Sequence, residues 1–190
     1  MHSIYDCVKA FKKLLNIRYH IIIGRKGKTA KLDITFHKED CFHLMGLQYL
    51  TDRTDLNQNR GLIFDKIDEH NITNEHVESS DFYYKIQDRI DYLPFLEQFF
   101  DSTDSIIRYN QKSNNFSMIQ ADYLMKSKSD ERNIFIFLSK NKDENYFCRS
   151  FFPETKYDYS LNQASWTLLH KEKDNLITKE KDIIYDRLKK

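Results

Sequence analysis

The sequence predicts an α+β fold: N-terminal helices and a short β-hairpin, a helical middle layer, and then a curved antiparallel sheet of about four to five strands. Apolar residues recur at helical spacing in residues 4–15 and again in residues 81–101. From residue 105 onward the apolar runs are short and are bounded by polar turns. Helices followed by strands in one chain are typical of an α+β domain.

Composition predicts a single folded domain spanning residues 1–190. The chain is 40% hydrophobic, with 14 Phe and 12 Tyr, which is enough apolar material for an aromatic core. We expect residues 52–104 to be an acidic helical insertion or layer and residues 174–190 to be a charged helix or frayed tail. The sequence has no apolar run of membrane-spanning length and no signal-peptide pattern at its start, so we expect a cytoplasmic protein with no membrane partner.

Charge is distributed unevenly along the chain. Lys and Arg exceed Asp and Glu by 5 in residues 1–51, fall short by 8 in residues 52–104, and exceed them by 4 in residues 105–190. If the two outer thirds form one unit, the molecule has a basic side and an acidic side. These sides are either ordinary solvated faces or, on the basic side, a surface that meets a polyanion.

The first third predicts a helix, a hairpin and a second helix. Residues 4–15 form the first helix, and residues 18–23 and 31–37 form two short strands around a Gly/Lys turn. The second helix runs from about Lys38 to Leu50, with acidic residues in its first turn. The three cysteines, Cys7, Cys41 and Cys148, have no metal-site spacing and predict buried thiols.

The last third predicts an antiparallel meander. Its strands cover residues 106–109, 119–126, 133–140, 146–152 and 166–173. The continuously apolar run Ile134–Leu138 indicates a strand that is covered on both faces. Strict alternation along residues 146–152 places Ser150 on one face with Cys148 and Phe152, and Arg149 on the other, so only one set can face a site.

The segment Phe36–Leu47 places His43 on an apolar helix, three residues before Gly46. A glycine inside a helix costs about 1 kcal/mol relative to alanine, so we expect Gly46 to remove a side chain that would crowd the His43 ring. Glu39 lies one turn earlier on the same face and can stabilise the imidazolium form. Two interpretations stay open: His43 is an acid–base group, or it is a histidine hydrogen-bonded within the core.

Short runs of the sequence carry a resemblance to a known family. They are Leu32–Phe36 leading into Phe42–Leu47, then Ile119–Met125, Ser150–Phe152 and Tyr157–Gln163. The chain resembles, over roughly residues 15–173, a phage-associated family in the barnase/EndoU/colicin/RelE-like nuclease superfamily. The resemblance implies leading helices before a curved antiparallel sheet of about four strands, whose face supports metal-independent RNA cleavage in active members.

Such cleavage needs a base for the 2′-hydroxyl proton, an acid for the leaving oxygen, and donors that hold the phosphate. His43 suits the first two roles, because its ordinary pKa of about 6.5 lies near neutral pH. The sheet must supply the other groups. We expect the catalytic partners to be Ser150, Tyr159 and Gln163, and the substrate-binding residues to be Lys126, Lys171, Glu39 and Gly46. Each partner also has a structural interpretation, as a turn, core or solvated side chain.

The sequence lacks the motifs of metal-dependent enzymes, of serine hydrolases and of nucleotide-binding enzymes. No histidine pair stands at metal-binding helical spacing within a carboxylate cluster, and no nucleophile elbow or nucleotide-binding glycine motif occurs in the sequence, so we expect no metal and no cofactor. The leading hypothesis is a metal-independent endoribonuclease of toxin or phage-conflict type, with RNA and a protein inhibitor or immunity partner as its partners. The alternatives are a catalytically inactive nuclease-like domain that binds RNA or a protein partner, and an interaction protein that works through its acidic middle.

Overall fold

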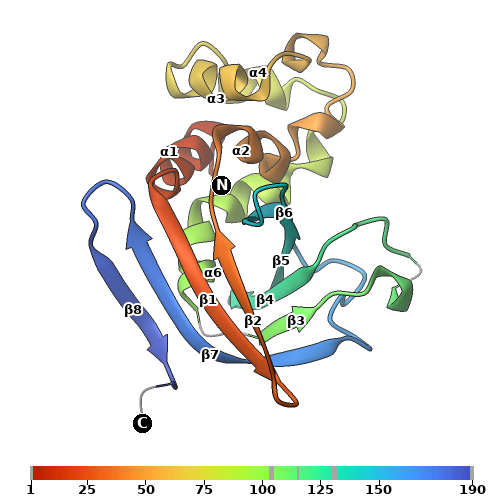
Figure 1. Ribbon diagram of the computed structural model, residues 1–190. Coiled ribbons are helices and arrows are strands. Elements are labelled where there is room, and N and C mark those ends of the chain that lie inside the picture. The colour runs from red at the N-terminus through yellow and green to blue at the C-terminus, as the bar shows by residue number, and fades with distance from the viewer. Residues whose placement is uncertain (1, 103–104, 115, 130–131, 189–190) are drawn as a thin grey trace.

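The computed structural model describes residues 2–102, 105–114, 116–129 and 132–188 (Figure 1). Its α-helices are α1 (Ile4–Leu14), α2 (Lys38–Met45), α3 (Arg60–Asp68), α4 (Asn74–Glu78), α5 (Gln87–Tyr92) and α6 (Leu96–Asp101). Single 3₁₀ turns are η1 (Leu47–Tyr49), η2 (Thr54–Leu56), η3 (Tyr83–Lys85), η4 (Leu93–Phe95) and η5 (Gln111–Ser113). The strands are β1 (Ile17–Arg25), β2 (Lys28–Ile34), β3 (Ser105–Arg108), β4 (Tyr123–Ser129), β5 (Arg132–Lys140), β6 (Tyr146–Pro153), β7 (Ala164–Asn175) and β8 (Lys181–Asp186).

The strands form one mixed sheet that closes on itself. Their order is β1-β2-β6-β5-β4-β3-β7-β8, and β1 also pairs with β7, so β1 to β7 form a closed ring to which β8 adds. The pairs are antiparallel except β2 with β6, which are parallel through Ile34 and Tyr146. Figure 1 shows α1 and α2 at the upper end of the curved strands, with α3 and α4 above them.

The predicted sheet of four to five antiparallel strands is wrong. β7 is long enough to pair with β3 through Ala164–Trp166 and with β1 through Thr167–Asn175, which joins the N-terminal hairpin to the later strands. β7 therefore lies beside β3, not beside β6 as a simple meander requires. These partners are far apart in sequence, and local periodicity carries no information about such pairing.

The predicted charged helix or frayed tail over residues 174–190 is also wrong where the structure describes it. Residues 181–186 form β8, which pairs antiparallel with His170–Asp174 of β7. The strand has charged ends and an apolar centre, and it has no apolar stripe at helical spacing. It is stabilised by pairing with the edge of β7. Figure 1 shows β8 on the outer left of the sheet.

Local sequence explains the first elements. Ser3 caps α1 with Asp6 in a capping box, and the apolar residues of α1 at helical spacing are buried. The β1–β2 hairpin, which confirms the predicted one, turns through Lys26 and Gly27, both with positive φ, as a two-residue hairpin turn requires. In the described part of the chain no helix combines the length and the apolar character needed to cross a membrane.

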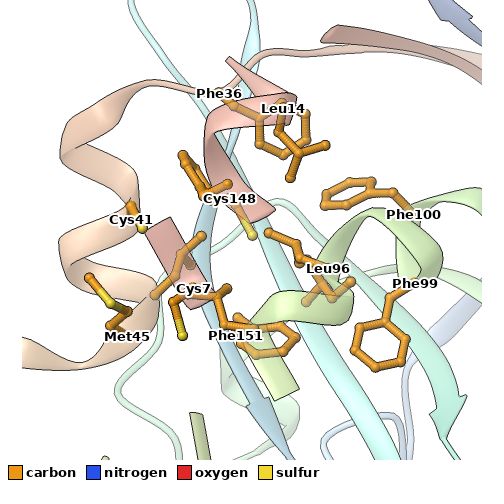
Figure 2. Close-up of a cluster of buried hydrophobic side chains, with 14 of the residues drawn as sticks. Cys7, Leu14, Phe36, Cys41, Met45, Leu96, Phe99, Phe100, Cys148 and Phe151 are labelled. Atoms are coloured by element: carbon orange, nitrogen blue, oxygen red, sulfur yellow. The ribbon is translucent and has the colours of Figure 1, made fainter. Parts of the chain in front are cut away.

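The core lies on both faces of β3, β4 and β5. Alternate residues such as Ile134 and Ile136 join the helices in a large cluster, while Phe135 and Phe137 join a second cluster on the opposite face. The double coverage predicted for residues 134–138 is therefore confirmed. Figure 2 shows the three cysteines in the large cluster, on α1, α2 and β6, and all three are buried free thiols as expected.

The helix that carries His43 ends five residues earlier than the predicted Leu50. α2 stops at Met45 because Gly46 adopts a left-handed conformation, with φ of 84°, and its N–H donates to the carbonyls of Phe42 and His43. Glycine is the usual residue at such a helix end, since it adopts positive φ without a Cβ clash. A Cβ at Gly46 would lie 2.8 Å from Cδ of Arg89 and 3.0 Å from Cγ2 of Ile86.

We expect Gly46→Ala to lower the free energy of unfolding by about 1–3 kcal/mol more than Gly27→Ala. Both glycines have positive φ, so both variants bear the backbone strain of a left-handed alanine. Only at position 46 does the added methyl meet packed side chains, because nothing lies within 4 Å of a Cβ at Gly27. Urea unfolding of both variants measures the difference, and equal losses would contradict the packing role of Gly46.

Candidate functional site

His43 lines a cavity of about 600 Å³ between α2, α3 and β6, which we call the His43 cavity. His43 lies in the last turn of α2, shortly before η1 begins at Leu47. The ring is half-buried and its centroid lies 6.0 Å from that of Phe42. The remaining walls of the cavity are formed by Glu39, Asp40, Gln48, Arg60, Phe147, Cys148 and Arg149.

The His43 cavity combines a neutral imidazole with two arginines. Burial lowers the pKa of His43 most, and the positive charge of Arg60 lowers it further; a hydrogen bond with Gln48 raises it in part, and the charge of Arg149 lowers it slightly. The imidazole is therefore unprotonated at neutral pH and able to accept a proton. Arg60 also lies over the Phe42 ring, with its guanidinium carbon 5.9 Å from the ring centroid. The two exposed arginines suit an anionic ligand.

Asp40 supplies a second titratable group to this cavity. It stands three residues before His43 on α2, so the two side chains lie on neighbouring positions of one helix face. Burial raises the pKa of Asp40 to about 6, although the hydrogen bond from the His37 N–H to its Oδ2 opposes the shift. A carboxyl with this pKa is partly protonated near neutral pH and can donate a proton.

Glu39 and Gly46 were both predicted to act beside the His43 ring, and the structure places them differently. Glu39 lines the same cavity, with its Oε1 close to the backbone of Gly61. Gly46 does not clear space for the His43 ring, contrary to our expectation, because the atoms nearest to its missing Cβ belong to Arg89, Ile86 and Tyr49. Its role is to end α2 and to let the Arg89 side chain pass.

A β-bulge in β6 decides which side chains reach the His43 cavity. Phe137 pairs with Ser150 and Leu138 with Cys148, so Arg149 is the extra residue. Cys148 and Phe151 are both buried in the large cluster, which strict alternation would forbid. We predicted that Ser150 shares a face with Cys148, and this is wrong: Arg149 rather than Ser150 lines the His43 cavity.

Ser150 and Tyr159 line a second cavity of about 490 Å³, which we call the aromatic cleft. It lies between α5, η1, β6 and the segments around residues 116–119 and 153–159. Tyr159 packs edge-on against the rings of Phe135, Phe137 and Phe152. The structure thus separates these two predicted partners from His43.

Arg89 enters the aromatic cleft from α5. Its guanidinium carbon lies 5.3 Å from the ring centroid of Tyr49 and 5.2 Å from that of Phe152, and its Nη1 donates to the Phe151 carbonyl at 2.7 Å. The aromatic cleft and the His43 cavity share a wall, because the consecutive residues Gln48 and Tyr49 line one each, as do Arg149 and Ser150.

The other predicted partners have structural contacts. Gln163 bridges the backbone of Asn110, accepting from its N–H at 2.8 Å and donating to its carbonyl at 3.1 Å. Nζ of Lys126 donates to Asp158 at 2.9 Å and to Ser160 at 3.0 Å. Lys171 is fully buried and donates to the carbonyls of Phe100 and Ser102, so it does not face the His43 cavity.

A third cavity lies on the outer side of β1, β7 and β8 and contains His170. Its ring lies 6.3 Å from that of His20, away from His43. The cations of this cavity are paired within it, Arg18 with Asp174 at 2.9 Å and Lys181 with Glu172 at 2.6 Å. Among the described residues, no group of three or more His, Cys, Asp or Glu side chains is arranged to hold a metal ion.

The sequence pattern singled out His43 as a candidate, but it did not single out Asp40, Arg60 or Arg149, which line the same cavity. Arg149 carried a usable signal, because the apolar residues Cys148 and Phe151 stand an odd number of positions apart on one strand. Asp40 also carried a signal, since it precedes His43 by three residues on the predicted helix. Nothing local in the sequence indicates that Arg60, at the start of α3, faces the same cavity.

Comparisons with known proteins bear on the family of the chain. No curated protein and no solved structure matches the chain. A family model described as phage-Barnase-EndoU-ColicinE5/D-RelE like nuclease4 matches residues 3–188. Because this match covers nearly the whole chain and confirms the resemblance of its short motifs, the chain belongs to this phage-associated family of nucleases.

Proposed function

We propose that the chain is a metal-independent endoribonuclease of toxin or phage-conflict type whose active site is the His43 cavity. The observation that carries this proposal is the convergence of a proton acceptor, a proton donor and two arginines on one cavity, His43 and Asp40 from α2 with Arg60 and Arg149. Membership in a nuclease family supports it from an independent direction. These groups are the ones that general acid–base cleavage of RNA needs.

The proposed reaction begins at the RNA 2′-hydroxyl. His43 accepts the hydroxyl proton while the 2′-oxygen forms a bond to phosphorus, and the bond from phosphorus to the 5′-oxygen breaks. Asp40 donates a proton to that leaving oxygen. The products are a 2′,3′-cyclic phosphate and a 5′-hydroxyl end, so all protons are accounted for by the two side chains. Arg60 and Arg149 hold the phosphate oxygens as negative charge grows on them.

The assignment of base and acid follows from the direction of the two pKa shifts. The lowered pKa of His43 favours the unprotonated form that a base needs. The pKa of Asp40, raised to about 6, leaves a protonated fraction near neutral pH that can act as the acid. Opposite shifts of two neighbouring titratable groups are the pattern by which enzymes divide these roles.

We expect His43→Ala to lower kcat/KM for RNA cleavage by about 10²–10⁴-fold, because the reaction loses its general base. The measurement is cleavage of total RNA by the purified protein in the presence of EDTA. His20→Ala is the matched control, since His20 lines the third cavity and lies outside the proposed site. Cleavage that persists in His43→Ala, or that is lost only in His20→Ala, would sink the assignment.

The pH dependence of cleavage provides a separate prediction. His43 is active only above its lowered pKa and Asp40 only below its pKa of about 6, so kcat/KM should peak on the acidic side of neutrality. Above pH of about 6 it should fall about tenfold per pH unit as Asp40 ionises. In Asp40→Asn we expect a lower rate and no such fall.

Asp40→Asn is a suitable variant because it preserves the fold. The amide oxygen can still accept from the His37 N–H, and the substitution removes a charge whose burial is unfavourable. Its thermal unfolding midpoint above pH of about 6 should therefore match or exceed that of the parent. A falling alkaline limb that persists in Asp40→Asn would show that another group supplies the proton.

A further inference from the structure

We propose that the aromatic cleft binds the bases of single-stranded RNA and delivers the strand to the His43 cavity. This inference rests on the proposed function, because it names the form of RNA that the same site would accept. Stacking on aromatic side chains is how proteins hold unpaired bases, and bases inside a duplex are stacked on one another and are not available for it. The aromatic cleft should therefore select single strands.

The first observation is a concentration of exposed rings at this one place. Tyr84 is 71% exposed and Phe116 44% exposed, and both line the aromatic cleft. Phe116 stacks on Tyr157, which is 40% exposed, with ring centroids 4.2 Å apart and planes 15° apart. Exposed apolar side chains that gather in one patch, rather than lying singly, are a feature of binding surfaces. The stacked pair offers a flat platform for a base.

The second observation is the charge of the same surface. Arg89 and Lys85 line the aromatic cleft, and Nζ of Lys156 lies 5.3 Å from the Tyr157 ring centroid. The acidic residue of the lining, Asp88, is paired with Arg132 at 3.3 Å. The surface is therefore positive and aromatic, which suits a phosphate-linked chain of bases better than an acidic or aliphatic protein surface.

The third observation is the shared wall between the two cavities. The β6 bulge directs Arg149 into the His43 cavity and the next residue, Ser150, into the aromatic cleft. In η1, Gln48 and Tyr49 divide in the same way. Consecutive residues are only about 3.8 Å apart along the chain, so the two cavities adjoin, and a strand whose bases occupy the cleft would continue into the His43 cavity, which Arg60 and Arg149 line.

Fluorescence anisotropy with a labelled 2′-O-methyl RNA of about 12 nucleotides tests the inference. This probe lacks the 2′-hydroxyl that the proposed reaction uses, so binding is measured whether or not the His43 chemistry is right. At about 0.1 M salt we expect the single strand to bind the full-length protein at least tenfold more tightly than the same strand annealed to its complement.

Variants locate the binding surface. Phe116→Ala and Tyr157→Ala should each weaken single-strand binding by about 5- to 100-fold, the usual effect of losing one stacked base. Ile177→Ala is the matched control, because Ile177 is 69% exposed at the turn between β7 and β8, outside the aromatic cleft. Thermal unfolding should give the same midpoint for all three variants, since these side chains are exposed.

Two outcomes would overturn the proposal: equal binding of single strand and duplex, and parental affinity in both aromatic variants. The second would leave the cleft as a surface for another class of ligand, such as a protein. Loss of single-strand binding in Phe116→Ala and Tyr157→Ala without loss of cleavage in His43→Ala would support the cleft and reject the proposed function. The two proposals therefore fail in distinguishable ways.

Discussion

The placement of Cys148 and Phe151 in one core is the constraint on which the candidate site depends. The two side chains stand three positions apart on β6, and a regular strand would send them to opposite faces. The bulge at Arg149 resolves this by adding one residue, so both remain buried in the large cluster. The same bulge turns Arg149 toward His43 and Ser150 toward the aromatic cleft. Core packing thus fixes the wall that divides the two cavities.

Closure of the sheet makes this wall rigid. β6 pairs with β5 along most of its length and with β2 at Tyr146, and the helices cover its inner face. β7 completes the ring by pairing with both β3 and β1. A strand that is paired along one edge, anchored at one end of the other edge and packed on one face has little freedom to shift its register. The arginine and serine that it presents are therefore carried by a fixed element, which favours an accurate site.

Local patterns predicted the elements better than their assembly. The helix over residues 4–15, the hairpin and the later strands follow from apolar periodicity, which is a property of neighbouring residues. The ring closure was missed, because β1 and β7 are separated by more than a hundred residues. His43 was proposed as a candidate from its unusual place on an apolar helix, and the structure places it in a cavity. Ser150 was assigned to the wrong cavity because alternation was assumed to continue through residue 149.

Gly46 shows how a glycine in an apolar helical run can be recognised as unusual and still be assigned the wrong neighbour. A glycine in an apolar helical run indicates close approach of another group, and this much was right. The group is Arg89 and not a substrate beside His43. The same glycine N–H donates to the His43 carbonyl and ends α2 there. Gly46 therefore places His43 at the helix end on one side while Arg89 enters the aromatic cleft on the other, so one residue helps to position both the His43 cavity and the aromatic cleft.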